Sequence, residues 1–125
     1  MSYQMALETC DREIFYLWGS INDFLPDANG EYLEEWTMSD CEYIQKRFKE
    51  TADVILGTEL ADHCTCELTT ALDAYDKVVD AAKKTADVSR CKVAAIHCVD
   101  VFHEIRMVCQ RARRVIAARG ALIPA

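Results

Sequence analysis

Residues 91–116, CKVAAIHCVDVFHEIRMVCQRARRVI, place apolar side chains at alternating spacings of three and four. Such spacing keeps one face of an α-helix apolar, and we call this face the seam of the helix. The seam consists of Cys91, Ala94, Cys98, Val101, Ile105, Val108, Ala112 and Val115, widened by Phe102, Cys109 and Ile116. The pattern predicts a long helix over residues 90–118, which Gly120 and Pro124 end.

Three earlier segments carry seams of the same kind, so helices are also expected over residues 4–25, 40–56 and 59–84. The first of these seams begins at Tyr3 and extends over about six turns. Four sustained seams with short second and third connections predict an all-α fold, an antiparallel four-helix bundle. A chain of 125 residues with 51% apolar content suits one helical domain over residues 1–125.

Local sequence signals set the expected boundaries between these helices. Pro26 ends the first helix and opens a long connection over residues 26–38. Ser39 and Glu42 have the spacing of a capping box at the start of the second helix. The other expected caps are a left-handed Gly57 and the hydroxyl side chains of Thr58 and Ser89.

Charge is distributed unevenly along the chain. Residues 1–67 hold 15 acidic and 4 basic side chains (net −11), whereas residues 68–125 hold 6 acidic and 10 basic ones (net +4), which together give −7. The acidic portion repels a polyanion, so nucleic acid is disfavoured as a partner. The basic side chains near the end of the chain also oppose the negative end of a helix; they are Arg106, Arg111, Arg113, Arg114 and Arg119.

No segment reaches the run of about 18 apolar residues that a membrane helix needs, and the first residues do not resemble a signal peptide. We therefore expect a cytoplasmic protein without a membrane partner. The seven cysteines include no Cys-x-x-Cys pair, and in the cytoplasm they are expected to be reduced thiols.

The densest group of chemically active side chains is ADHCTCELTT, residues 61–70. Cys64 lies on the seam of its helix, whereas Cys66 lies about 200° around the helix axis and should face solvent. Six thiols fall on or beside seams and are expected to pack in the core: Cys10, Cys41, Cys64, Cys91, Cys98 and Cys109. A bundle lined with cysteines resembles the copper-storage proteins, and this resemblance implies Cu(I) binding as an alternative.

Two further groups place possible metal ligands outside the seams. His63, Cys66 and Glu67 share an outer face of one helix, and His97 and Glu104 lie beside the seam of another. A zinc site needs about four convergent ligands, which these groups supply only if the two helices pack side by side. We expect solvated charge pairs instead, with no metal ion and no other cofactor.

Carboxylates occur in pairs three residues apart: Glu31 with Glu34, followed by Glu50 with Asp53 or by Glu59 with Asp62. These pairs are similar to the acidic motif of the all-α nucleotide pyrophosphohydrolases related to MazG. The resemblance implies Mg²⁺ held by these carboxylates against a nucleoside triphosphate. The two later pairs fall largely opposite their seams, whereas a metal pocket needs them turned inward.

A second resemblance to an enzyme family rests on Arg90 and His97, near the start of the fourth helix. Their spacing looks like the Arg-x4–6-His motif of HEPN-type ribonucleases, helical bundles that usually act as dimers. The spacing places both side chains on one face of the helix, as a shared catalytic site requires. Cys91 stands where that family often has a polar residue.

Large apolar side chains outside the seams indicate an interface with another protein. Met5, Phe15 and Tyr16 lie on the back of the first helix, and Trp36 lies in the connection. Burying a side chain of this size is worth about 1.5–3 kcal/mol, so their exposure invites a partner unless residues 26–38 fold back over them. The surrounding acids would steer a basic partner: Glu8, Asp11, Asp23, Glu34 and Glu35.

The sequence contains no Ser/His/Asp set, no Gly-rich phosphate loop and no nucleophilic cysteine motif. It therefore favours a non-catalytic regulatory module that occupies a basic or apolar surface of another protein, for example an inhibitor or anti-activator of a transcription factor or effector enzyme. Self-association as a homodimer through the same patch is compatible with this role. The pyrophosphohydrolase, the ribonuclease and the metal-binding bundle are the alternatives.

Overall fold

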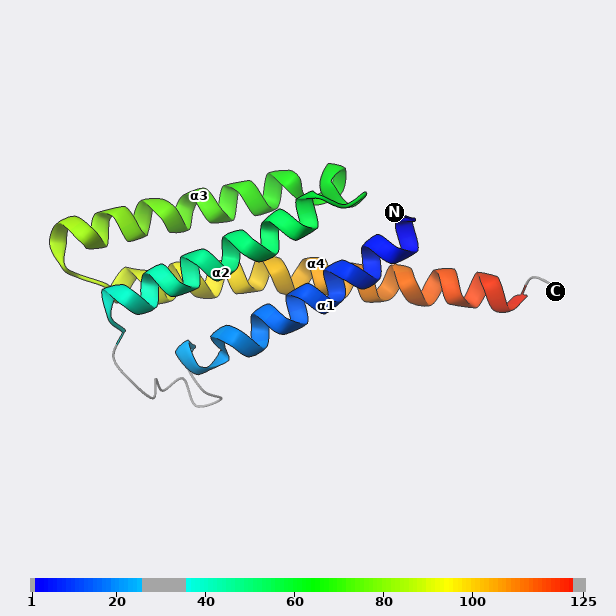
Figure 1. The fold of residues 1–125 in the computed structure, drawn as a ribbon, viewed down its shortest axis with the longest axis horizontal. Coiled ribbons are helices and arrows are strands. Elements are labelled where there is room, and N and C mark those ends of the chain that lie inside the picture. The colour runs from blue at the N-terminus through cyan, green and yellow to red at the C-terminus, as the bar shows by residue number, and fades with distance from the viewer. Residues whose placement is uncertain (1, 26–35, 123–125) are drawn as a thin grey trace.

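Four α-helices make up most of the part of the chain that the computed structural model describes, residues 2–25 and 36–122 (Figure 1). They are α1 (Tyr3–Ile21), α2 (Met38–Leu56), α3 (Ala61–Thr85) and α4 (Ser89–Leu122), and a 3₁₀ turn, η1 (Asn22–Phe24), follows α1. Consecutive helices contact each other, and α1 also packs against α4, which closes the ring of helices. The predicted all-α four-helix bundle is confirmed.

The centre of the bundle is a group of aromatic rings on three helices. Phe48 of α2 lies edge-on to Tyr75 of α3, with ring centroids 5.4 Å apart, and stacks on Phe102 of α4 at 5.7 Å. The hydroxyl group of Tyr75 donates a hydrogen bond of 2.9 Å to the backbone carbonyl of Cys41. The polar atom of Tyr75, the largest fully buried side chain, is thus satisfied, and the rings contribute their full apolar burial to stability.

The start of α2 differs from the expected capping box. α2 begins at Met38, so Thr37 is its N-cap, and the Thr37 hydroxyl accepts a hydrogen bond from the amide of Asp40 at 3.2 Å. The Asp40 carboxylate accepts in return from the amide of Thr37 at 2.8 Å. The capping box at Ser39 and Glu42 is therefore wrong by two residues, because Thr37 and Asp40 have the same spacing.

The two turns that flank α3 also differ from expectation. Gly57 has a φ of −81°, so it is not the left-handed residue predicted there. The left-handed residue is Ala86, at the end of α3, with a φ of 60°. The amide of Ser89 donates a hydrogen bond of 3.0 Å to the Asp87 carboxylate, so Asp87 rather than Ser89 supplies the side-chain acceptor before α4.

Thr58 does serve the α2–α3 turn, although α3 itself begins three residues later. Its hydroxyl donates to the backbone carbonyl of Ile55 at 2.6 Å and accepts from the amide of Leu60 at 3.2 Å. The thiol of Cys10 on α1 lies 3.6 Å from the same hydroxyl. The α2–α3 hairpin therefore closes at the level of Cys10, in the middle of α1.

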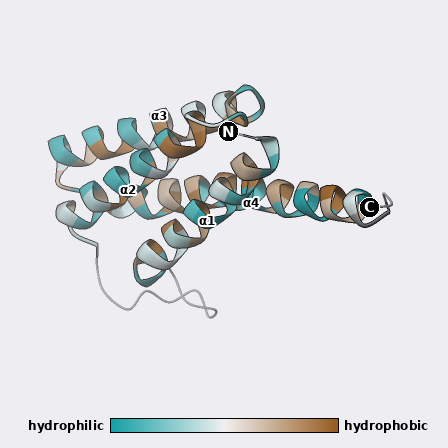
Figure 2. Cartoon of the chain, turned by 45° about the vertical axis from the view of Figure 1, so that its right-hand side comes forward, coloured by the Kyte–Doolittle hydropathy of each residue, from teal (hydrophilic) through white to brown (hydrophobic). Residues whose placement is uncertain are grey.

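Of the described residues, only the first part of α1 and the last part of α4 continue beyond this turn, and α4 projects past the other helices (Figure 1). Hydrophobic residues recur along the projecting part of α4 (Figure 2). We call residues 3–9 and 108–120 the open end of the bundle. Three seam residues predicted to be buried are exposed there, Tyr3 at 42%, Val108 at 56% and Val115 at 50%. Their prediction as core residues is wrong: α2 and α3 end before they cover Tyr3 and Val115, and Val108 lies at the edge of α3 without being covered by it (Figure 1).

The seams of the two longest helices also drift by one residue. Val79 and Ala95 are fully buried, whereas Val78 and Ala94, which the alternating spacing selects, are only half-buried. A straight α-helix has 3.6 residues per turn and so departs gradually from a repeat of seven. Within residues 2–25 and 36–122, the helices lack the combination of length and apolarity needed to cross a bilayer.

Candidate functional site

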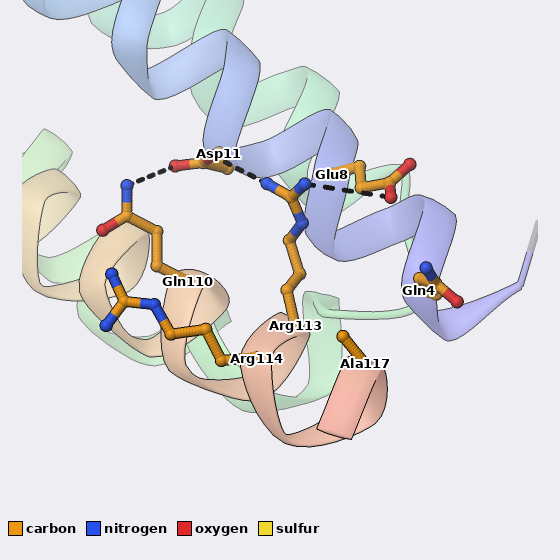
Figure 3. Close-up of a pocket in the computed structure, with 7 residues that line it drawn as sticks. All are labelled: Gln4, Glu8, Asp11, Gln110, Arg113, Arg114 and Ala117. Atoms are coloured by element: carbon orange, nitrogen blue, oxygen red, sulfur yellow. Dashed lines mark hydrogen bonds and ion pairs between the residues drawn. The ribbon is translucent and has the colours of Figure 1, made fainter. Parts of the chain in front are cut away.

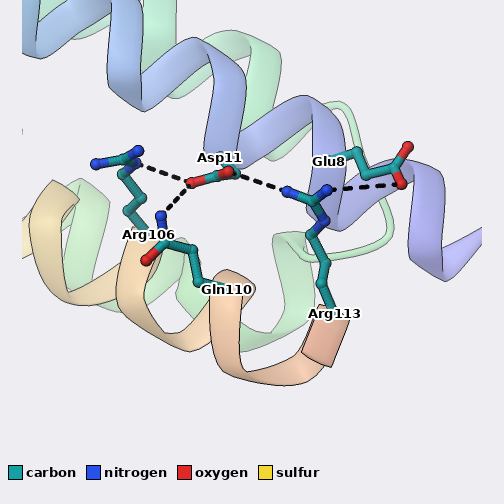
Figure 4. A network of polar contacts seen from close by, with 5 residues as sticks. All are labelled: Glu8, Asp11, Arg106, Gln110 and Arg113. Atoms are coloured by element: carbon teal, nitrogen blue, oxygen red, sulfur yellow. Dashed lines mark hydrogen bonds and ion pairs between the residues drawn. The ribbon is translucent and has the colours of Figure 1, made fainter. Parts of the chain in front are cut away.

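A polar network between α1 and α4 is centred on the carboxylate of Asp11 (Figure 4). The carboxylate accepts hydrogen bonds from Arg106 Nε at 2.8 Å, from Gln110 Nε2 at 3.3 Å and from Arg113 Nη1 at 3.1 Å. The Asp11 side chain is only 16% exposed, and the two guanidinium groups offset the cost of removing its charge from water. Asp11 is therefore an internal anchor of the α1–α4 contact and not the freely exposed rim charge that the sequence predicts.

The same network borders a shallow hollow of about 380 Å³ (Figure 3). Arg113 reaches from α4 toward α1, where its guanidinium group lies 3.1 Å from Asp11 and 3.9 Å from Glu8. Two carboxylates thus face the hollow together with Arg113 and Arg114. This mixture of charges opposes the binding of a phosphate at the arginine-rich end of the chain.

Beside the network, three aromatic side chains lie within four residues of α1. Phe15 and Tyr16 are 57% and 56% exposed, and their rings meet edge-on with centroids 6.1 Å apart. The guanidinium carbon of Arg106 lies 5.2 Å from the centroid of the Phe15 ring. Trp18 contacts His103 of α4, with ring centroids 5.2 Å apart. We call Phe15, Tyr16, Trp18 and His103 the aromatic surface.

Only two of the four predicted interface residues belong to the aromatic surface. Met5 is exposed, but it lies ten residues from Phe15, which is about 15 Å along the helix axis. Trp36 is 6% exposed and packs edge-on against Phe24, with centroids 6.4 Å apart. Trp36 is therefore part of the core and offers no exposed face. Glu34 and Glu35 lie outside the described residues.

The sequence does not single out Trp18 and His103. Trp18 follows Asp11 by seven residues, so both side chains lie on the flank of α1 that faces α4. His103 lies within one turn of Arg106, on the corresponding flank of α4. The sequence therefore contains the spacing that places Trp18 and His103 on these flanks. That spacing can be interpreted only once the pairing of α1 with α4 is known.

The paired carboxylates of the pyrophosphohydrolase alternative do not converge. Glu50 is exposed and forms ion pairs with Lys46 at 3.8 Å and with Arg47 at 2.9 Å on its own helix. The other members that the structure describes are also exposed: Asp53, Glu59 and Asp62. Glu31 and Glu34 lie outside the described residues. Among the residues that are described, no group of three or more His, Cys, Asp or Glu side chains could hold a metal ion.

Three of the proposed metal-ligating side chains do meet at one cleft between α3 and α4. His63, Glu67 and Glu104 line this α3–α4 cleft of about 180 Å³, whereas Cys66 and His97 do not. Most of its lining is apolar and is supplied by Leu60, Cys64, Ile105, Val108 and Cys109. The cleft thus combines an apolar floor with two carboxylates at its edge.

Arg90 and His97, the pair that looks like a ribonuclease motif, are both exposed on α4. Arg90 lines a hollow with Lys77 and Thr85 of α3, and His97 is not among the residues lining it. The two side chains share a face of the helix, as their spacing predicts, but they do not line a common pocket.

The thiols follow the seam assignment. Cys66 is exposed and the other six cysteines are buried, as predicted. Burial raises the pKa of Cys98 to about 12 and that of Cys64 to about 11. A hydrogen bond with Cys109 lowers the pKa of Cys10 to about 7, and the same contact raises the pKa of Cys109.

The aromatic surface presents two half-exposed rings beside an ordered polar network, on two helices that the bundle holds in place. No protein-family model, curated protein or solved structure matches this chain.

Proposed function

We propose that this protein is a non-catalytic regulatory module that binds another protein through the aromatic surface. The observation that carries the proposal is the pair of adjacent rings, Phe15 and Tyr16, each more than half exposed. Large aromatic side chains are the residues that most often dominate the energy of protein interfaces. By occupying a surface of its partner, such a module excludes other ligands from that surface.

The surroundings hold this surface in a fixed arrangement before any partner binds. The Arg106 guanidinium group is held by Asp11 at 2.8 Å while it lies against the Phe15 ring. Trp18 packs against His103 across the α1–α4 contact, with ring centroids 5.2 Å apart. Side chains that are already ordered lose less conformational entropy on binding, which favours affinity.

The charges near the rings favour an apolar patch on the partner over a strongly basic one. Asp11 is neutralised by two arginines, so it does not contribute a free negative charge. Arg12, within one turn of both rings, lies 3.9 Å from the Glu13 carboxylate, so this pair adds no net charge. Among the acids expected around the interface, Glu8 and Asp23 remain exposed.

The test is a site-specific crosslink at the aromatic surface. A photoreactive phenylalanine analogue in place of Tyr16 should capture a partner from the native host lysate, and the same analogue in place of Tyr43 should not. Tyr43 is a matched control because it is an exposed tyrosine on a different helix, α2.

The substitution Tyr16→Asp should abolish capture of that partner in a pull-down, whereas Tyr43→Asp should not. Both variants should keep the helical circular dichroism of the wild type. Undiminished capture by a folded Tyr16→Asp variant would show that the aromatic surface is not the interface.

A further inference from the structure

The open end exposes part of the side of α1 and α4 that faces the core, although Ala6, Leu7 and Cys109 remain buried there. Tyr3, Val108 and Val115 continue the seams of their helices, yet about half of each side chain is in contact with solvent. Val108 still borders the start of α3, but beyond it α1 and α4 continue past the α2–α3 turn, which closes near Cys10 (Figure 1). Two neighbouring positions of a four-helix bundle are therefore empty at this end.

The apolar residues of α4 at the open end form one stripe, in which Val108 and Val115 are exposed and Ala112 and Ile116 are partly buried against the core. Val108, Ala112, Val115 and Ile116 follow each other at spacings of four, three and one, so they share one face of the helix. Val108 also lines the α3–α4 cleft, where α3 begins. The stripe thus starts at the cleft and runs along the side of α4 that α3 would cover if it were longer.

We propose that a second copy of this chain covers the open end in a symmetric dimer. A two-fold axis supplies a second α1–α4 pair, and the two pairs together complete a four-helix layer around the exposed seams. Each copy then contributes the same surface to the contact, as an isologous interface requires. This inference concerns a different surface from the proposed partner-binding site and does not depend on it.

The charges along the stripe fit an antiparallel arrangement of the two α4 helices. Between residues 105 and 122, α4 carries five arginines and no acidic residue, whereas Glu67 and Glu104 stand at the edge of the α3–α4 cleft. If the helices cross near Ala112, residue 119 of one copy lies beside residue 105 of the other, seven positions from the crossing on each side. Arg119 of each copy then faces Glu104 and Glu67 of the other.

This distribution favours a second copy over an unrelated acidic helix. The stripe is basic at its far end and acidic at the cleft, so reversing its direction brings opposite charges together at both ends. The small side chain of Ala112 permits close approach of the helices at the crossing. Arg113, which lies next to the crossing, is turned toward α1 and is engaged by Asp11 and Glu8. Arg113 therefore adds no free positive charge at the crossing.

Sedimentation equilibrium of the full chain measures the outcome directly. The wild type should show a concentration-dependent mass that approaches twice the chain mass of 14.2 kDa. Val115→Asp should raise the dimer dissociation constant by at least about 100-fold, since each dimer buries the unpaired carboxylate twice. Val93→Asp is the matched control: Val93 is 70% exposed on the same helix but far from the open end, so its dimer should persist.

Charge-reversal substitutions test how the two α4 helices are aligned in the dimer. Arg119→Glu and Glu104→Arg should each weaken the dimer by at least about 10-fold, and the double variant should recover most of the lost affinity. Tyr16→Asp should leave the dimer intact, which separates this interface from the aromatic surface. A wild type that stays monomeric, even if a different protein binds the stripe, would overturn the proposal, as would a dimer that Val115→Asp leaves unchanged.

Discussion

The closed part of the bundle and its open end are built from the same two helices and have opposite surroundings. Within the closed part, Ile14 and Cys98 lie on the seams of α1 and α4 and are buried. At the open end, Tyr3 and Val115 continue those seams and are about half exposed. The comparison shows that an apolar seam specifies which face of a helix avoids water, whereas the lengths of the neighbouring helices decide whether this face is covered by the same chain.

The largest expected effect on the free energy of unfolding comes from a substitution in the aromatic core of the closed part. Phe48→Ala should lower the free energy of unfolding by about 3–5 kcal/mol, because it removes the ring between Tyr75 and Phe102 and leaves a cavity. Urea denaturation followed by circular dichroism measures the change. Val54→Ala, on an exposed position of the same helix, is the control and should change stability by less than about 0.5 kcal/mol. A loss below 1 kcal/mol for Phe48→Ala would mean that the closed part is not tightly packed.

Alkaline pH should destabilise the closed part through its buried thiols. Burial raises the pKa of Cys41 and of Cys98 to about 12 from an ordinary value of 9.0, so the folded chain keeps protons that the unfolded chain releases. The resulting stability is fully present below pH 9 and is lost as the pH rises from 9 toward 12. The wild type should lose on the order of 3 kcal/mol between pH 9 and 11, as measured by urea denaturation at each pH.

Cys10 changes the stability with pH in the opposite direction to Cys41 and Cys98. Its pKa is lowered to about 7, so the stability that it provides increases between pH 7 and 9 and stays constant above pH 9. It therefore does not offset the loss above pH 9. Cys98→Ala should make that loss shallower, whereas Cys66→Ala, at an exposed thiol, should not change the slope. An equal slope in all three proteins would contradict the assignment of Cys98 to the core.

The Asp11 network lies between the two regions, and its loss should have an intermediate effect. Asp11→Asn keeps the size of the side chain and removes the charge that faces Arg106 and Arg113, which should cost about 1–3 kcal/mol in the free energy of unfolding. Glu8→Gln is the control, since Glu8 contacts the same Arg113 at 3.9 Å from an exposed position and should cost less than about 1 kcal/mol. Equal effects of the two substitutions in urea denaturation would show that Asp11 does not anchor the α1–α4 contact.

The fold was predictable from the sequence because seam periodicity is a property of each helix alone. The four seams gave the number of helices, their order and the burial of six thiols. The capping box failed at Ser39 because Thr37 and Asp40 offer an equivalent pair, and a choice between two such pairs depends on where packing of the helix begins. The exposed seam at the open end was not predictable, since it depends on where two other helices stop.

The candidate site was predictable only in part, for a similar reason. Phe15 and Tyr16 were found because they lie opposite the seam of their own helix. Trp36 was misplaced because burial in a connecting segment leaves no periodic signal. The role of Asp11 required knowledge that α4 passes beside α1, a contact between residues more than 90 positions apart in the sequence.

The last test makes the same change, Val to Ala, once in the closed part and once at the open end. It has the smallest expected effect on stability, and it compares the two regions most directly. Val79→Ala in the closed part should lower the free energy of unfolding by about 2 kcal/mol, since Val79 is fully buried. Val115→Ala should lower it by less than about 0.5 kcal/mol at concentrations where sedimentation shows a monomer, because its methyl groups are half exposed. Both values come from urea denaturation under identical conditions. If Val115→Ala were as costly as Val79→Ala in the monomer, another part of the same chain would have to cover the seam at the open end, and no room would remain there for a second copy.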